Sequence, residues 1–252
     1  MAGCSGHSKN LKFGAADIGG VYYSFASTFT QLADKEIDGY TFETKTTAGS
    51  VANLRLISDG YIDLAIVQAD LLSDAYNATG TFADKKYQKG YKAVASLYTE
   101  CCQIVVRKDS GITGIDDLIN KTVSVGASES GSEKMSGITD ELINKVNMDY
   151  TEAAEKLKAG EIDAFFCTAG TRTEVIGQLS KECDICLISL DDKCIDKMLS
   201  AYSLCEKYTI PAGTYNGQDS DVTTIGVKAV LIAKQSLSDD VIKNVTKYII
   251  SI

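Results

Sequence analysis

Residues 47–70, TAGSVANLRLISDGYIDLAIVQAD, decide the fold of this chain. Val51, Leu54 and Ile57 follow the i, i+3 spacing of one buried helix face. Ser50 precedes them and is expected to cap the helix, because a hydroxyl oxygen can accept a hydrogen bond from a free backbone N–H group there. The first half of the stretch therefore predicts a helix that begins beside a hydroxyl.

The second half of the stretch predicts a buried strand. Gly60 follows the last periodic residue, where a left-handed residue is expected to end the helix. Residues 62–67 form a short apolar run of the kind buried in a parallel sheet, and Gln68 follows it. Ligands of open α/β sheets bind outside the carboxyl ends of strands and at helix N-termini, so Ser50 and Gln68 are predicted at a binding site.

A short repeat indicates a second copy of this unit. Residues 160–163, GEID, match residues 60–63, GYID, and each follows a helical pattern and precedes an apolar strand. Polar residues come after both strands, at Gln68 in one copy and at 168–173 in the other. Two such units that face each other would enclose a small molecule.

The rest of the chain alternates helical and strand patterns, which is typical of an α/β fold. Expected strands are 11–16, 40–46, 93–97, 103–106, 121–125, 162–166, 183–190 and 223–233; expected helices begin near 21, 50, 70, 131, 150, 191 and 241. The helix that begins at 131 is expected to continue to 146. We expect one domain from 11–106 plus 222–252 and a second from 107–221, with 1–10 as a tether.

Composition excludes several classes of function. The chain has 252 residues, a formal net charge of −9 and 44% hydrophobic residues, which suits a globular protein of two modest domains. Nucleic-acid phosphates need clustered lysine and arginine, and this acidic chain has three arginines, so no nucleic-acid partner is expected. No segment has the apolar length of a membrane-spanning helix.

The amino terminus, MAGCSGHSKN, resembles the end of a bacterial lipoprotein signal, although the apolar segment that should precede it is absent. It predicts Cys4 as a lipid anchor and an extracytoplasmic location, either on the outer face of the cytoplasmic membrane or in the periplasm. The alternative is a cytosolic protein that happens to begin this way. His7, the single histidine, lies in this tether and is not expected to be catalytic.

The remaining seven cysteines are an odd number, so they cannot all pair within the chain. Cys183 and Cys186 form a C-x-x-C motif, which could be redox-active or half of a zinc site. No second such motif and no nearby histidine completes a metal site, so we expect no bound metal and favour buried or partly paired thiols.

Two further loops could present backbone N–H groups to a ligand. Gly20 opens a helix with Tyr22 and Tyr23 in its first turn, but the spacing is not that of a dinucleotide fingerprint. Residues 126–133, GASESGSE, contain the S-x-x-E spacing of a capping box. Ser132 stands where a phosphate-binding loop needs lysine, so ATP binding is disfavoured. We expect no cofactor.

Several motifs together resemble the TAXI family of solute receptors, which serve tripartite ATP-independent periplasmic (TRAP) transporters. These motifs are GGVYYSF, TTAGSVANLRLISDGYIDLAIVQAD, YKAVASLYTE, VVRKDSGI, VSVGASESGSE, GEIDAFF and TIPAGTYNGQDSDV. The resemblance implies a two-lobed fold of the periplasmic binding protein type (type II-like), with two mixed or parallel sheets, flanking helices and hinge strands. It also implies a monomer that captures glutamate, glutamine, 2-oxoglutarate or a similar small carboxylate for a membrane permease.

The resemblance also implies a set of ligand contacts. These are Gly20, Val21, Tyr22, Tyr23, Gly49, Ser50, Gln68, Ser130, Gly131, Ser132, Thr168, Gly170, Thr171, Arg172 and Thr173. This chain departs from the family pattern at Ser24, where proline is frequent, and at 171–173. Arg172 is either an added carboxylate partner or a solvated surface cation. Family members are expected to continue with further helices beyond Ile252.

Two other classes of function stay open from the sequence. The first is an enzyme on the same two-lobed fold, but no Ser, His, Asp set can be assembled, and Cys167 lacks an imidazole base. The second is a ligand-binding sensor or surface antigen. We expect a binding protein without catalysis.

Overall fold

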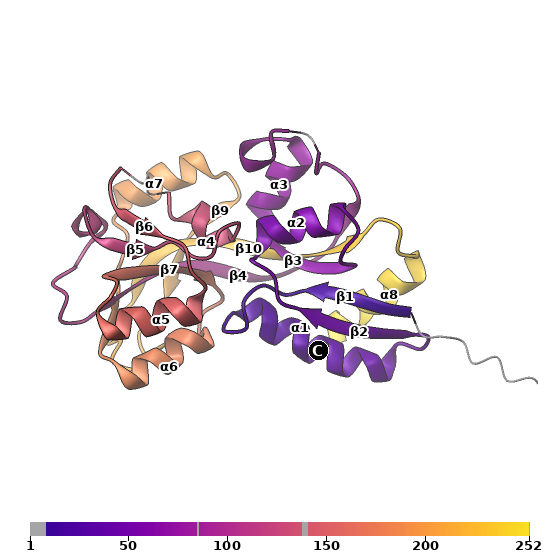
Figure 1. Cartoon of the computed structure of the whole chain (residues 1–252), viewed down its shortest axis with the longest axis horizontal. Helices are drawn as coiled ribbons and strands as arrows, with labels where there is room; N and C mark the ends of the chain where they lie inside the picture. The colour runs from indigo at the N-terminus through magenta and orange to yellow at the C-terminus, as the bar shows by residue number, and fades with distance from the viewer. Residues whose placement is uncertain (1–8, 85, 138–140, 252) are drawn as a thin grey trace, which may run out of the picture.

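Two α/β lobes, joined by two long strands, make up the computed structural model of this protein (Figure 1). The structure describes residues 9–84, 86–137 and 141–251. The predicted lipid anchor Cys4 and residues 1–8 of the tether therefore lie outside the described residues. The predicted boundary at residue 10 is wrong, because Lys9 and Asn10 already pair with β2 (Tyr40–Lys45) as the start of β1 (Lys9–Gly14). Within the described part of the chain, no helix is long and apolar enough to cross a membrane.

The first lobe contains the organising stretch and both ends of the described chain. Its elements are β1 (Lys9–Gly14), α1 (Val21–Glu36), β2 (Tyr40–Lys45), α2 (Ser50–Ser58), β3 (Leu64–Gln68), α3 (Ala69–Asn77), η1 (Gly80–Phe82) and α8 (Asp239–Ser251). Parallel pairing places β1 between β2 and β3. The carboxyl ends of β1 and β3 therefore open toward the second lobe (Figure 1).

The second lobe repeats this arrangement. Its elements are η2 (Ile115–Leu118), β5 (Thr122–Ser124), α4 (Gly131–Met135), β6 (Asn144–Val146), α5 (Tyr150–Ala159), β7 (Ala164–Ala169), α6 (Glu174–Glu182), β8 (Ile185–Leu187), α7 (Asp192–Ala201) and β9 (Cys205–Ile210). Here β5 lies between β6 and β7, again in parallel, as β1 does between β2 and β3.

The repeated G-x-I-D motif has the same structural role in both lobes. Asp63 accepts a 3.0 Å hydrogen bond from the backbone N–H of Lys12, and Asp163 accepts a 2.8 Å bond from that of Thr122. Each carboxylate thus ties the start of one strand to its parallel neighbour. Gly60 and Gly160 have φ of +83° and +76°, which glycine adopts without strain. The predicted repeat is confirmed.

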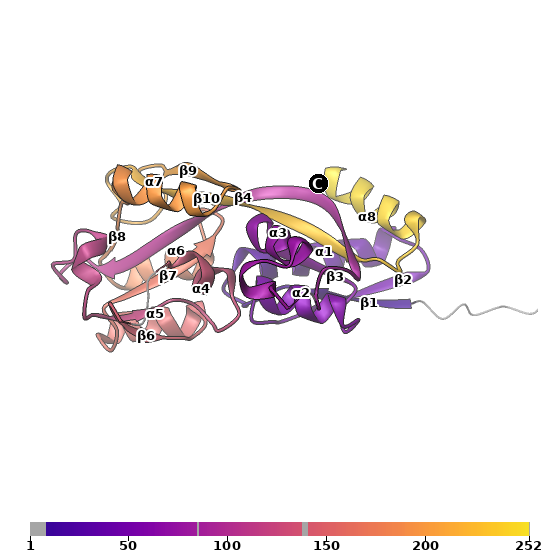
Figure 2. The same ribbon diagram turned by 90° about the horizontal axis from the view of Figure 1, so that it is seen from above.

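The lobes are joined by β4 (Tyr91–Arg107) and β10 (Val222–Lys234), which run side by side across both of them (Figure 2). The two strands pair antiparallel from Tyr91 to Cys101, after which β4 pairs with β7 and β8. The hydrogen-bonded strand order is therefore continuous, β2-β1-β3-β10-β4-β7-β5-β6. A predicted break between strands 93–97 and 103–106 is wrong, because the polar residues between them stay paired with β10.

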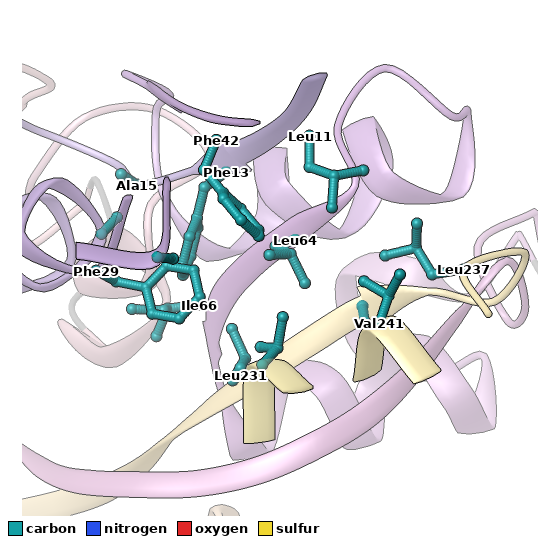
Figure 3. Close-up of a cluster of buried hydrophobic side chains, with 14 of the residues drawn as sticks. Leu11, Phe13, Ala15, Phe29, Phe42, Leu64, Ile66, Leu231, Leu237 and Val241 are labelled. Carbon is teal, nitrogen blue, oxygen red and sulfur yellow. The ribbon is translucent and has the colours of Figure 1, made fainter. Parts of the chain in front are cut away.

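Phe29 belongs to the buried core of the first lobe (Figure 3). Its ring makes edge-to-face contacts with Phe13, Phe42 and Tyr248, at centroid distances of 5.4–5.9 Å. Leu231 of β10 and Val241 of α8 belong to the same buried cluster, so the last part of the chain completes the lobe with which the chain begins.

Two local predictions about helices are wrong. The helix expected over 131–146 ends at Met135, because Gly137 turns the chain with φ +56° and 144–146 pairs as β6. The N-cap of α2 is Gly49 rather than Ser50. Gly49 has φ +124°, which favours glycine, and the Ser50 side chain turns toward the end of β3 instead.

Candidate ligand pocket between the lobes

A pocket lies between the lobes, beside the strands that join them. Its empty volume is about 460 Å³, which includes space that is open to solvent. The residues that line it are Ala16, Asp17, Gly20, Val21, Tyr22, Ala48, Gly49, Ser50, Gln68, Glu100, Ala127, Ser130, Gly131, Asp149, Tyr150, Thr168 and Ala169. Both lobes and β4 therefore contribute to one small site.

The wall from the first lobe is a chain of hydrogen bonds between the end of β3 and the starts of α1 and α2. Ser50 Oγ accepts a 3.1 Å bond from the backbone N–H of Gln68 and lies 3.4 Å from the phenol oxygen of Tyr22. The first turn of α1 has no side-chain cap at Gly20, so its N–H groups are open to an acceptor.

The wall from the second lobe has the same construction. Ser132 Oγ accepts a 2.7 Å bond from the backbone N–H of Thr168 and lies 2.6 Å from the phenol oxygen of Tyr150. The Tyr150 hydroxyl in turn donates a 3.1 Å bond to the Thr168 carbonyl. In each lobe, a serine at a helix start thus holds the end of the strand that follows the G-x-I-D motif, β3 or β7, and meets a tyrosine hydroxyl.

Glu100 of β4 stands between these walls, and it is 2% exposed. Tyr22 donates a 2.8 Å hydrogen bond to its Oε2 atom. Burial, with a smaller contribution from Asp70, raises the pKa of Glu100 to about 8, even though hydrogen bonds from the Tyr22 and Gln68 side chains oppose the shift. The carboxyl group is therefore largely neutral at pH 7 in this pocket.

The pocket is rich in acceptors and acidic groups. Gln68 Oε1, Thr168 Oγ1 and Asp17 Oδ2 are buried and have no hydrogen-bond partner among the described residues. Burial and the nearby Asp149 raise the pKa of Asp17. Among the described residues that line the pocket, none is lysine or arginine. A ligand that brings hydrogen-bond donors would satisfy these acceptors.

The lobes are in contact around the pocket, so the structure is closed. The Glu129 carbonyl accepts bonds from the backbone N–H groups of Val51 and Ala52, at 3.2 and 3.4 Å, and its carboxylate pairs with Arg55. A methyl group on Gly131 would come within 2.3 Å of the Gln68 carboxamide. The α4 backbone therefore packs directly on Gln68 across the cleft.

The structure brings nine of the predicted contacts to this pocket. They are Gly20, Val21, Tyr22, Gly49, Ser50, Gln68, Ser130, Gly131 and Thr168. Ser132 is fully buried behind the wall and supports Thr168. Tyr23 packs instead against the core of the first lobe.

The predicted contacts at 170–173 lie away from the pocket lining. Gly170 packs near Tyr98 and Val21, and Thr171 is half-buried outside the lining. Arg172 is exposed with φ +63°, which fits a solvated surface cation. Thr173 is held by the Tyr215 hydroxyl, which accepts a 3.1 Å bond from its backbone N–H and donates a 2.6 Å bond to Gln103.

Four functional candidates were not predicted from the sequence as contacts: Asp17, Glu100, Asp149 and Tyr150. Glu100 carried a signal, since it is an isolated carboxylate in a run of strand residues, YTECCQIVV. Asp17 also follows the first strand closely, where polar side chains reach a site.

Solved structures with the same arrangement of lobes cover nearly the whole chain. The arginine-bound Gly52Ala mutant of ArgBP from T. maritima matches with TM-score 0.59 and 16% identity, over 96% of this chain and 95% of that one. The GluR0 ligand-binding core with L-glutamate matches with TM-score 0.59 and 10% identity, over 98% and 93%. A putative L-cystine ABC transporter protein from Listeria monocytogenes matches with TM-score 0.60 and 14% identity, over 96% and 89%.

At these identities the likeness shows the fold, and the predicted two-lobed periplasmic binding protein fold is confirmed. The sequence itself matches a family model over residues 13–251. The chain therefore belongs to the NMT1-like family.

Proposed function

We propose that this protein is the extracytoplasmic solute receptor of a TRAP transporter of the TAXI type. It captures an amino acid or similar small carboxylate, of the glutamate, glutamine and 2-oxoglutarate class, and delivers it to a membrane permease. The observation that carries this proposal is the small pocket lined by both lobes and by a strand that joins them. A solute in that position touches every part that moves when the lobes separate.

Hinge closure follows from this position. We place the hinge in β4 and β10, between a domain of 11–106 plus 222–252 and a domain of 107–221. A solute that forms hydrogen bonds with Tyr22 and Gln68 on one side and with Tyr150 on the other can make all of these contacts together only in the closed state. Its differential affinity for that state shifts the equilibrium toward closure, and the permease reads the closed surface.

The carboxylate end of the solute has a natural position in the first lobe. The uncapped first turn of α1, at Val21 and Tyr22, supplies free N–H groups and the positive end of a 16-residue helix. The three solved structures named above are an arginine-bound protein, a ligand-binding core with L-glutamate and a putative L-cystine ABC transporter protein, which supports an amino-acid class of ligand.

The TAXI motifs support a TRAP permease rather than an ABC permease as the partner. They also support a monomer that is tethered to the outer face of the membrane through Cys4. Labelling with a palmitate analogue tests the tether: wild type takes up the label and Cys4→Ala does not. An unlabelled wild-type protein would contradict the lipid anchor while leaving solute binding untouched.

Catalysis by a cysteine has little support in this structure. Cys167, the nucleophile considered from the sequence, is fully buried, and burial holds the pKa of its thiol well above the usual range. A buried neutral thiol is a poor nucleophile. The described cysteines are all free, and no group of them with acidic residues forms a metal site in the described part of the chain.

Calorimetry and small-angle scattering together test the proposed function. Wild-type protein is titrated with L-glutamate, L-glutamine, 2-oxoglutarate, L-arginine and L-cystine, and scattering is recorded with and without each. We expect at least one solute to bind and to reduce the radius of gyration. Binding without contraction would contradict hinge closure, and no binding by any of these solutes would contradict the ligand class.

A further inference from the structure

We propose that Glu100 recognises a protonated amine on the solute, and that it gives up its own proton to solvent when the amine binds. This inference rests on the proposed function and deepens it, because it selects amine-bearing solutes within the proposed class. It also makes solute binding a proton-releasing step.

The position of Glu100 is the first support. Its side chain is buried, lines the pocket and is fixed by the Tyr22 hydroxyl at 2.8 Å. Tyr22 is itself only 6% exposed and lies 3.4 Å from Ser50 Oγ, so the carboxyl group is held in place before any solute arrives. Because this acceptor is already held in place, ordering its side chain costs little entropy when the solute binds.

The buried acceptors around the pocket are the second support. Gln68 Oε1, Thr168 Oγ1 and Asp17 Oδ2 lack partners among the described residues, and Gln68 is 1% exposed. A buried acceptor without a hydrogen-bond partner destabilises the empty pocket. An ammonium group has three N–H donors and no acceptor, so it suits this lining. A second carboxylate on the solute would face acceptors and acidic groups instead.

The charges around Glu100 are the third support. The titratable groups that interact with it are Tyr22 of α1, Asp70 of α3, Tyr98 and Cys101 of β4, Tyr150 of α5 and Cys167 of β7. All of these are neutral or acidic. Lys134 lies nearby but acts on Asp70 and forms an ion pair with Asp74 at 3.5 Å. The positive charge that a buried Glu100 carboxylate needs must therefore come from the solute.

The proton balance follows directly. Before binding, Glu100 is a neutral carboxylic acid and the free solute carries R–NH₃⁺. After binding, the pair is Glu100–COO⁻ with R–NH₃⁺, and one proton has passed to solvent. Because burial raises the pKa of Glu100 to about 8, binding at lower pH includes the cost of removing that proton. Affinity should therefore rise by about tenfold per pH unit up to about pH 8, and then level off.

Calorimetry in buffers of different ionisation enthalpy measures the protons released on binding. At pH 7 we expect close to one proton per bound amino acid for wild type. Glu100→Gln keeps an acceptor for Tyr22 but cannot ionise, so it should lower amino-acid affinity by about 100-fold and release no proton. The matched control Glu206→Gln, at an exposed strand residue outside the pocket, should behave as wild type.

The comparison of solutes keeps the proposal testable even if Glu100→Gln does not fold. Wild type should bind L-glutamate about 100-fold more tightly than 2-oxoglutarate or glutarate, which lack the amine. Equal binding of these solutes, or proton release that survives in a folded Glu100→Gln, would overturn the proposal.

A panel of simple amines, putrescine and agmatine, separates this inference from the proposed function. If these amines bind with proton release while no amino acid or carboxylate binds, Glu100 recognises amines and the proposed solute class is wrong. If carboxylates bind and nothing that carries an amine does, the solute-receptor function stands and the role of Glu100 is wrong. If no solute of either kind binds, both proposals fail.

Discussion

Tyr22 of α1 donates a 2.8 Å hydrogen bond to Glu100 of β4, so a helix of the first lobe is tied directly to a strand that crosses between the lobes. Both side chains are buried, at 6% and 2% exposure. The bond therefore links the pocket, the first lobe and the hinge in a single contact.

Tyr22→Phe removes this bond and leaves the ring. We expect the free energy of unfolding to fall by about 1–2 kcal/mol, because Glu100 loses a buried partner. The pKa of Glu100 should rise, since the Tyr22 hydroxyl lowers it. Urea unfolding at pH 7 measures the first effect. Tyr23→Phe, at the neighbouring half-buried tyrosine, is the control and should leave stability within experimental error.

Glu100 should also make the protein less stable as the pH rises. Its pKa is about 8 in the fold against an ordinary value of 4.5, so between these values the unfolded chain binds fewer protons than the native one. Stability should therefore fall by up to roughly 1.4 kcal/mol per pH unit in that window, and Asp70, with a pKa raised to about 6, adds to the fall below pH 6.

Urea unfolding of wild type and Glu100→Gln at pH 5 and pH 8 separates the contribution of Glu100. The difference in stability between the variant and wild type should shift in favour of the variant at pH 8. Parallel pH profiles for the two proteins would show that Glu100 ionises freely in the fold.

Gly131→Ala should block closure of the lobes without unfolding them. The added methyl group meets the Gln68 carboxamide at 2.3 Å, and that contact exists only while the lobes are together. Solute affinity should fall by about 10- to 100-fold, and unfolding free energy by less than about 1 kcal/mol. Calorimetry and urea unfolding check these two values.

Gly177→Ala is the matched control, because a methyl group there meets nothing within 4 Å. Gly177 lies inside α6, so alanine should stabilise the protein by roughly 0.5–1 kcal/mol and leave affinity unchanged. Wild-type affinity in Gly131→Ala would mean that the solute binds with the cleft open.

Arg55→Ala tests the ion pair with Glu129 across the cleft. The two side chains are 41% and 34% exposed, so the pair should contribute less than about 1 kcal/mol to closure and its loss should weaken binding by about five-fold at most. The effect should shrink at high salt. Lys207→Ala, which breaks the Lys207–Asp192 pair within the second lobe, should leave affinity unchanged. A similar loss from both variants would assign the effect to net charge.

The sequence supported the parts of the fold that depend on local pattern. Gly60, Gly160 and the aspartates three residues later could be found because the same turn and the same strand contact occur in each lobe. Ser50 and Gln68 could also be predicted to line the pocket from their positions in the chain. They lie at a helix start and a strand end, and those positions meet at one edge of a sheet.

Contacts that depend on the arrangement of distant segments could not be predicted. Glu100 reaches the pocket because β4 continues through both lobes, whereas the local pattern suggested two shorter strands. The strand-end pattern that locates Gln68 in the site also predicts residues 170–173 there. The Tyr215 hydroxyl holds Thr173 instead, and Tyr215 lies 42 residues further along the chain. No local pattern records that contact.

The central position of β10 has a consequence for biosynthesis. In the first lobe β10 lies between β3 and β4, so that sheet lacks an inner strand until Lys234 has left the ribosome. Until then β3 and β4 present unpaired edges, which other chains can join. The second lobe also lacks a strand at that stage, because β9 pairs with residues 222–227 of β10. A nascent chain of this protein therefore needs protection from pairing with other chains, and its amino-terminal half needs it for the longest time.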